Sequence, residues 1–353
     1  MADKVRIEEL KQELEKAPGF EKSRLLNELA KLYFGDRDNQ KKIIEYGEKA
    51  MQAAREFKNE EQEIYALVNI GFGYWKTDND EKGMEFANKG IKLARGRDKR
   101  GMLYALKLKS TIYAYNAEHE KSFKIDKRML TIYKEIGDKK GIAKCTHWVG
   151  SSYYALGEIS KAYEYYKKAL TLYRNVGNKE MTAQMLTYLG SFNSRYGNDE
   201  KAMEYFLKSA EIAEKEGFES MRCRVYEAIG KFYKKRKNYI KSFEYYEKAL
   251  KISEKINSTF WLVTIYYSLG DLNYLEKKYD KALEYFEQAM KYQLQMNDTG
   301  GNGGADILIR IGHVYVEKKD YGKALGNYQK ALEIAVKFKE YENETESYKG
   351  MGE

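Results

Sequence analysis

A ten-residue phrase returns about every forty residues along this chain of 353 amino acids. It reads KAYEYYKKAL at 161–170, KAMEYFLKSA at 201–210, KSFEYYEKAL at 241–250 and KALEYFEQAM at 281–290. A self-similar period of this length is typical of repeat architectures, in which each copy buries its apolar face against its neighbours. The period therefore predicts one array of stacked copies of a single structural repeat.

Aligning the phrase gives eight starting lysines, spaced 39 to 42 residues apart: Lys42, Lys82, Lys121, Lys161, Lys201, Lys241, Lys281 and Lys323. Eleven residues before the last seven of these lysines stands a small residue: Gly71, Ser110, Gly150, Gly190, Gly230, Gly270 or Gly312. Two helices that cross closely need one side without bulk, so we expect these small residues at helix crossings. The many aromatic residues of the phrase would then fill the space that remains.

Each repeat has the pattern of two helices. Residues 185–197 and 199–217 both place apolar side chains at steps of three and four, which predicts amphipathic helices. Gly197 suits the left-handed end of the first helix, and Asn198 or Asp199 suits the start of the second. The turns are short enough to make neighbouring helices antiparallel. The sequence therefore predicts an all-α protein.

The arrangement of Leu189, Gly190, Ala202, Phe206 and Ala210, repeated in outline down the chain, resembles the tetratricopeptide repeat. The forty-residue period is similar to that of a subclass typical of bacterial signalling and regulatory proteins. The resemblance implies a right-handed superhelical solenoid of antiparallel helix pairs. It also implies that first helices line a concave groove and that second helices form the outside.

We expect three parts along the chain: a lead-in helix or cap over 1–19, eight helix-pair repeats over 20–340, and a final segment over 341–353. The final segment would be the first helix of an incomplete ninth repeat, with its small residue at Gly352, or a C-terminal cap. A further effector domain downstream, or self-association through the open C-terminal end, would cover its apolar face.

The sequence offers little catalytic chemistry. Its three histidines, His119, His147 and His313, lack cysteine or carboxylate partners at the spacing of a metal site. No nucleophile elbow or phosphate-binding loop occurs. We therefore expect no enzyme activity, no cofactor and no metal.

The chain also has no apolar run long enough to span a bilayer and no apolar segment of a secretion signal at its start. These features predict a cytoplasmic protein without membrane contact. The formal net charge is +9. Residues 61–140 and 221–300 each carry five more basic than acidic side chains, which favours partners with acidic segments.

The leading hypothesis is a non-enzymatic scaffold that binds a peptide or a partner domain in its concave groove, as a sensory or regulatory module of a larger signalling protein. The alternative is a nucleic-acid-binding helical repeat that uses basic and aromatic groove residues. It is less favoured because the charge is modest and acidic residues occur in every repeat.

Counting from the small residues places particular first-helix positions in the groove. The expected partner-binding residues are aromatic or neutral in the N-terminal half: Phe72, Trp75, Tyr104, Tyr115, His147, Trp148, Tyr154 and Tyr188, with Thr111 and Ser151 beside them. They are basic in the middle: Arg195, Arg224, Lys231, Lys234 and Lys235. A structural alternative is that Trp75 and Trp148 only pack between neighbouring repeats.

Overall fold

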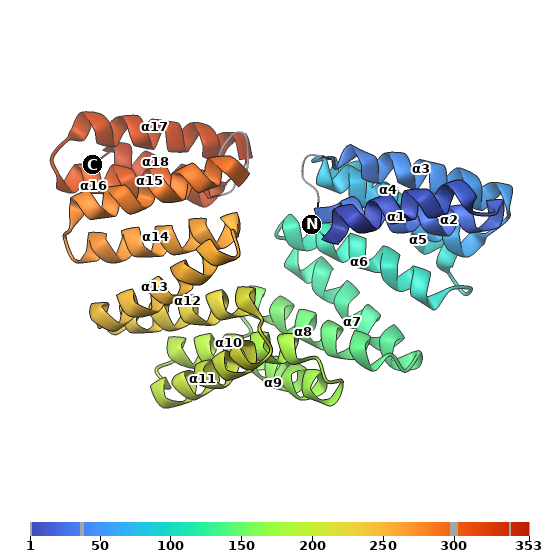
Figure 1. Cartoon of the computed structure of the whole chain (residues 1–353), viewed down its shortest axis with the longest axis horizontal. Helices are drawn as coiled ribbons and strands as arrows, with labels where there is room; N and C mark the ends of the chain where they lie inside the picture. Colours follow the sequence, from blue (N-terminus) through green and yellow to red (C-terminus); the bar gives the residue numbers. More distant parts are fainter. Residues whose placement is uncertain (1, 36–38, 297–302, 339, 353) are drawn as a thin grey trace. The chain divides into compact units, whose positions relative to one another are not determined.

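The computed structural model describes residues 2–35, 39–296, 303–338 and 340–352. These residues form eighteen α-helices and one short 3-10 segment (Tyr33–Gly35), with no strand among them (Figure 1). Neighbouring helices along the chain pack as antiparallel pairs. The predicted all-α solenoid of helix pairs is confirmed.

The chain divides into two compact units, Met1–Val176 and Gly177–Glu353. In unit 1, α1 (Ala2–Lys16) precedes four pairs: α2 (Gly19–Leu32) with α3 (Lys41–Glu56), α4 (Glu60–Lys76) with α5 (Asp80–Ala94), α6 (Lys99–Tyr115) with α7 (His119–Glu135), and α8 (Lys139–Ala155) with α9 (Ile159–Asn175). Unit 1 therefore holds a helix at the place of the predicted lead-in and half of the predicted eight pairs.

Unit 2 holds the other four pairs and a last single helix. These are α10 (Lys179–Arg195) with α11 (Asp199–Lys215), α12 (Glu219–Lys235) with α13 (Tyr239–Lys255), α14 (Thr259–Leu275) with α15 (Tyr279–Met296), α16 (Gly304–Glu317) with α17 (Tyr321–Phe338), and then α18 (Tyr341–Gly352). The division into two units has no counterpart in the sequence pattern, since the period continues through it.

The turns between helices show one of the two predicted end signals at residues 197–199. Gly197 ends α10 with a left-handed φ of +80°. Asn178 caps α10 by accepting a hydrogen bond from the Met181 amide, whereas the Asn198 side chain makes no such bond at the start of α11. The predicted stop is therefore present, and the predicted cap is made at the neighbouring turn but not by Asn198.

The small residues of the repeat lie where aromatic rings approach the backbone. A Cβ added to Gly230 would lie 2.4 Å from the Tyr246 ring, and one added to Gly190 would lie 2.6 Å from the Phe206 ring. Both rings are buried. In these two pairs, a glycine on the first helix packs against an aromatic residue on the second.

The last helix, α18, begins 20 residues after the start of α17, as α14 begins 20 residues after the start of α13, so the period continues into it. Gly350 lies against Tyr328, with an added Cβ 2.5 Å from the ring, whereas Gly352 has no atom within 4 Å of such a Cβ. Gly350 takes the position that Ser268 has two residues before Gly270, so it packs on the ring of the preceding pair. Gly352 as the small residue of a ninth repeat stays a prediction.

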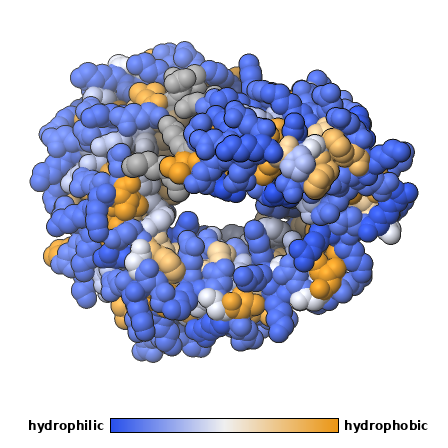
Figure 2. Space-filling view, turned by 45° about the vertical axis from the view of Figure 1, so that its right-hand side comes forward, coloured by the Kyte–Doolittle hydropathy of each residue, from blue (hydrophilic) through white to orange (hydrophobic). Residues whose placement is uncertain are grey.

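The surface is mostly polar. Figure 2 shows a largely hydrophilic face with separate hydrophobic patches. Among the described helices, none combines the length and the apolar character that crossing a bilayer requires.

Candidate functional site

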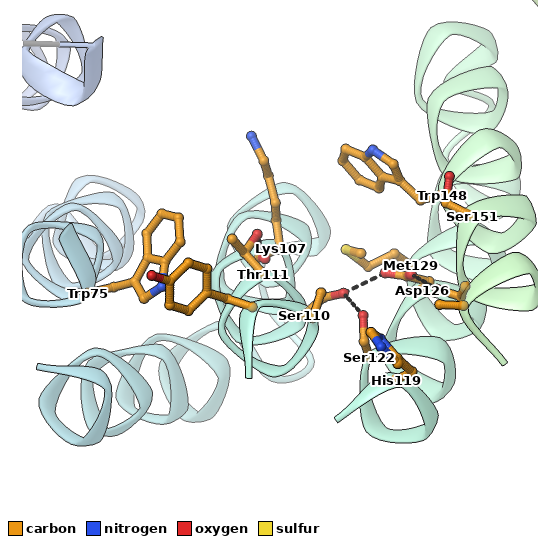
Figure 3. Close-up of a pocket in the computed structure, with 14 residues that line it drawn as sticks. Trp75, Lys107, Ser110, Thr111, His119, Ser122, Asp126, Met129, Trp148 and Ser151 are labelled. Carbon is orange, nitrogen blue, oxygen red and sulfur yellow. Dashed lines mark hydrogen bonds between the residues drawn. The ribbon is translucent and has the colours of Figure 1, made fainter. Parts of the chain in front are cut away.

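A cavity of about 490 Å³ opens on the surface formed by the first helices of unit 1, α4, α6 and α8, which we call the first-helix face. Trp75 lies at one side of it and Trp148 at the other (Figure 3), and Tyr115, whose ring meets that of Trp75, also lines it. Asp126 and Met129 reach it from α7 beneath. The backbones of α4 and α6 approach closely, whereas α6 and α8 make almost no close contact, so the opening lies between these two helices.

The cavity exists because one repeat lacks its aromatic residue. Five residues after the starting lysine, the last five repeats place a ring: Tyr166, Phe206, Tyr246, Phe286 and Tyr328. The third repeat places Asp126 there, and Ser110 takes the position of the glycine. Two short polar side chains thus stand where a ring and a glycine meet elsewhere, and the volume of the ring is left open.

Earlier repeats fill this position in another way. The first two repeats hold Gly47 and Ala87 there, and Ile70 and Ile112 supply the missing bulk. The residue forty positions after Ile112 is Ser152, which is too small to do the same. The third repeat therefore has neither a ring at this position nor a counterpart of Ile112 large enough to fill it.

Serine hydroxyl groups hold the Asp126 carboxylate in place. Ser110 Oγ donates to Oδ1 at 2.6 Å, and Ser152 Oγ donates to Oδ2 at 2.9 Å. Ser122 Oγ lies 3.0 Å from Ser110 Oγ. Because the one hydroxyl hydrogen of Ser110 is already used in the hydrogen bond to Asp126, Ser122 must be the donor in this second contact. The result is a small polar network at the floor of the cavity.

Asp126 is only 4% exposed. Burial raises the pKa of its carboxyl above the usual value, and the hydrogen bonds from Ser110 and Ser152 oppose part of that rise. Within the described part of the chain, none of the ion pairs includes Asp126. A buried carboxylate with no cation of its own protein is costly to keep ionised.

Aromatic rings form the walls. The ring of Trp75 meets that of Tyr115 edge to face, with centroids 6.0 Å apart. Lysine ammonium groups lie over both tryptophans, Lys76 at 4.9 Å from the Trp75 centroid and Lys144 at 5.2 Å from that of Trp148. Tyr115 is 62% exposed, so large apolar surface is available at the edge of the cavity.

Lys107 stands at the mouth. Its side chain extends away from Asp126 in Figure 3. Burial lowers the pKa of Lys107, and the positive charges of Lys144 and Lys31 lower it further. Thr111, one turn later on α6, also lines the cavity. Its hydroxyl group donates a hydrogen bond to the Lys107 carbonyl oxygen at 2.8 Å.

The structure brings together some of the residues that the sequence placed in the groove. Trp75, Thr111, Tyr115, Trp148 and Ser151 all line the cavity.

His147 and Tyr154 also lie on α8 but do not line the cavity. His147 lies against the Tyr166 ring at 6.0 Å, and burial, followed by the charge of Lys144, lowers its pKa to about 4. Tyr154 is 37% exposed at the end of α8.

Phe72 lies in the core, and its predicted position in the groove is wrong. It is 5% exposed and packs against Phe34, Trp75 and Tyr104. Tyr104 is half-buried, and its hydroxyl donates to Asn69 Oδ1 at 2.6 Å. Both side chains therefore support the α4–α6 contact from within.

The basic residues expected in the middle of the groove lie in unit 2, and several are paired there. Lys231 contacts Glu227 at 2.5 Å, and Lys234 pairs with Asp271. Lys235 donates to the Arg195 carbonyl at 3.3 Å. These bonds reduce the positive charge that the surface of α12 offers to a partner.

Two other predicted residues of unit 2 also have partners within the chain. The Arg224 guanidinium lies 5.3 Å from the centroid of the Trp261 ring. Tyr188 is half-buried, and its hydroxyl accepts a hydrogen bond from Gln184 Nε2 at 3.1 Å.

The network of Asp126 with Ser110, Ser122 and Ser152 was missed by sequence reasoning. The signal was present, because Asp126 is the one charged residue at its position in the repeat alignment. In the described residues, no group of three or more His, Cys, Asp or Glu side chains is arranged to hold a metal ion.

Comparisons with known proteins agree with this architecture. A family model described as tetratricopeptide repeat matches residues 142–215 and 221–295, and a second model of the same description matches residues 305–335. Together they cover just over half of the chain. No curated protein matches the sequence.

Several solved structures are similar. Aspartyl phosphate phosphatase F from Bacillus subtilis has a TM-score of 0.62 at 16% identity, covering 94% of this chain and 93% of that one. The apo form of RapI has a TM-score of 0.61 at 16% identity, covering 78% and 99%. A Rap protein complexed with Competence and Sporulation Factor has a TM-score of 0.57 at 16% identity, covering 96% and 99%. Identities this low show a shared fold alone.

Proposed function

The chain belongs to the tetratricopeptide repeat family, whose members are generally non-catalytic scaffolds, and from that premise we propose that it binds a peptide segment of a protein partner on the first-helix face of unit 1. Stacked helix pairs of this kind present a preformed extended surface to partners.

The observation that carries the proposal is the cavity with aromatic walls. Trp75, Tyr115 and Trp148 place large rings around a hollow of about 490 Å³. Tryptophan and tyrosine are enriched among the residues that dominate binding energy at interfaces. The two tryptophans are half-buried, so they pack between repeats and also present surface to the cavity.

A peptide fits this cavity better than a flat protein surface does. Its volume suits one or two side chains, which an extended segment can insert while its backbone runs along α6 and α8. One structure of similar fold holds Competence and Sporulation Factor, which supports ligand binding by this arrangement of helices. A regulatory role within a signalling protein extends the proposal by analogy of fold.

The test uses peptides selected from a random display library on the intact protein. We expect Trp148→Ala and Tyr115→Ala to weaken their binding by roughly tenfold or more in fluorescence anisotropy, as for interface anchors. Tyr115 is exposed, so its variant keeps the fold even if Trp148→Ala does not. Leu207→Ala is the matched control, because Leu207 is 53% exposed on the second helix α11. Equal losses in all three variants, or none, would refute the proposed site.

Two of the sequence predictions extend the proposal. Acidic segments of a partner would meet α12 of unit 2, where Lys231→Glu with Lys235→Glu should weaken their binding. A nucleic-acid ligand would instead lose affinity steeply as salt rises. The pairing of Lys234 with Asp271 argues against it, since that charge is already compensated.

Self-association would use the end of unit 2. Tyr341 and Tyr348 on α18 are 73% and 57% exposed. Analytical ultracentrifugation across concentrations tests this, and a monomer at high concentration would exclude it.

A further inference from the structure

The floor of the cavity has a chemistry of its own, a carboxylate enclosed by hydroxyl groups and aromatic rings. We propose that Asp126 binds the guanidinium or ammonium group of a basic side chain carried by the partner peptide. That this basic side chain belongs to a peptide rests on the proposed function. That the site prefers a cation rests on Asp126 and its surroundings alone.

The first step is the position of Asp126 in the repeat. The last five repeats fill the same position with a ring, and the corresponding glycine accepts that ring. Asp126 gives up this packing and buries a charged group instead. Local departures from the rule that stabilises the other repeats are expected at functional sites. A structural role would be better served by the ring.

The second step is the state of the carboxylate. Ser110 and Ser152 each donate one hydrogen bond to it, one to each oxygen. A carboxylate has about four acceptor positions, so about two remain for a ligand. The serines fix its orientation without neutralising its charge. Among the described residues no cation forms an ion pair with it, so a bound cation would supply the missing countercharge.

The third step is the aromatic walls. Cations are attracted to the faces of tryptophan rings. Lys76 and Lys144 already lie over Trp75 and Trp148 on this surface. A guanidinium that enters between the two rings would replace one of these ammonium groups on a ring face along its path to Asp126. Guanidinium also binds a carboxylate through two parallel hydrogen bonds, which adds geometric selectivity.

Lys107 opposes this ligand at the mouth. Its ammonium group repels a basic side chain, and it extends away from Asp126 in Figure 3. A ligand must therefore reach past Lys107 to be bound. Removing that charge with Lys107→Met should strengthen cation binding. If Lys107→Met abolishes binding, the ligand group is an anion and the proposal fails.

The test compares N-acetyl-arginine amide with N-acetyl-citrulline amide, its neutral analogue of nearly the same shape. The readout is the indole N–H signals of the three tryptophans in NMR titrations of the intact protein. We expect the arginine probe to shift the signals of Trp75 and Trp148 and to bind roughly tenfold tighter than citrulline. The signal of Trp261 is the internal control, since this side chain is buried in unit 2.

Two variants separate charge from shape. Asp126→Asn keeps the size of the side chain, and we expect it to bind both probes equally weakly. Asp126→Phe places the ring of the later repeats in the cavity, and we expect it to fold and to bind neither probe. If the wild type binds both probes equally, or if Asp126→Asn keeps the preference for arginine, the cation site is wrong.

A further arm distinguishes the source of the cation. Propylguanidine carries the same guanidinium and the same single charge without a peptide backbone, and tighter binding of propylguanidine than of N-acetyl-arginine amide would overturn the assignment to a peptide. The two proposals fail separately. Selected peptides that shift Trp75 and Trp148 while the arginine probe does not would sink the cation site alone, and peptides that shift neither would sink the proposed function.

Discussion

Asp126 shows how one residue can turn a packing position into a binding position. In the neighbouring repeat Tyr166 lies against Gly150, where an added Cβ would be 3.0 Å from the ring. In the third repeat Ser110 and Asp126 replace this pair with a hydrogen bond. The exchange opens a cavity and leaves a carboxylate at its floor, and it makes the stability of the protein depend on pH at this position.

The sign of that dependence follows from burial. Because the pKa of Asp126 is raised in the folded state, its stabilising contribution is present below the unfolded pKa and is lost as pH rises through the folded pKa. We therefore expect Asp126→Asn to gain stability relative to the wild type as pH rises from about 3 to about 7.

Urea denaturation of both proteins at each pH measures this difference. Lys107 and His119 also line the cavity, and both are retained in the variant, so the comparison isolates Asp126. A difference that stays constant with pH, or that falls as pH rises, would contradict the account.

At the scale of the helix pair, a glycine and a ring define the crossing. Gly230→Ala puts a Cβ within 2.4 Å of the Tyr246 ring, so one of the two helices must shift. We expect a loss of about 1–3 kcal/mol in the free energy of unfolding, as for overpacked cores. Chemical denaturation measures it.

Gly326→Ala is the matched control. Gly326 lies in α17, and an added Cβ there meets no atom within 4 Å. Replacing a helical glycine by alanine without a clash should stabilise by up to about 1 kcal/mol. If both variants change stability by the same amount and sign, the close crossing is not what requires glycine at 230.

Much of this element-scale structure could be predicted from the sequence. The period locates the helix pairs and the small residues, because the same spacing of apolar and small residues recurs along the chain. Lys231 and Glu227 are four residues apart on one helix, so their ion pair was also within reach of sequence reasoning.

The cavity could not be predicted in the same way. It depends on three side chains from three helices: Ser110 replaces a glycine, Asp126 replaces a ring, and Ser152 is smaller than its counterpart Ile112. Lys234 and Asp271 pair across two repeats, and that contact needs the packed structure. The prediction of Phe72 in the groove is wrong because counting along α4 does not show that its ring packs against Tyr104 of α6.

At the scale of the whole molecule, the period and the compact units divide the chain differently. Eight helix pairs continue one repeat pattern, yet the structure groups them into residues 1–176 and 177–353. The candidate site lies wholly within the first unit, and the paired lysines of α12 lie within the second. The central claim therefore concerns one unit: its first-helix face receives the partner.

Photo-crosslinking tests this claim most directly. A benzophenone amino acid is placed at Tyr115, which is 62% exposed beside the cavity, or at Leu207, which is 53% exposed on the second helix α11. We expect display-selected peptides to crosslink at position 115 and not at position 207. Crosslinking at 207 with none at 115 would contradict this claim.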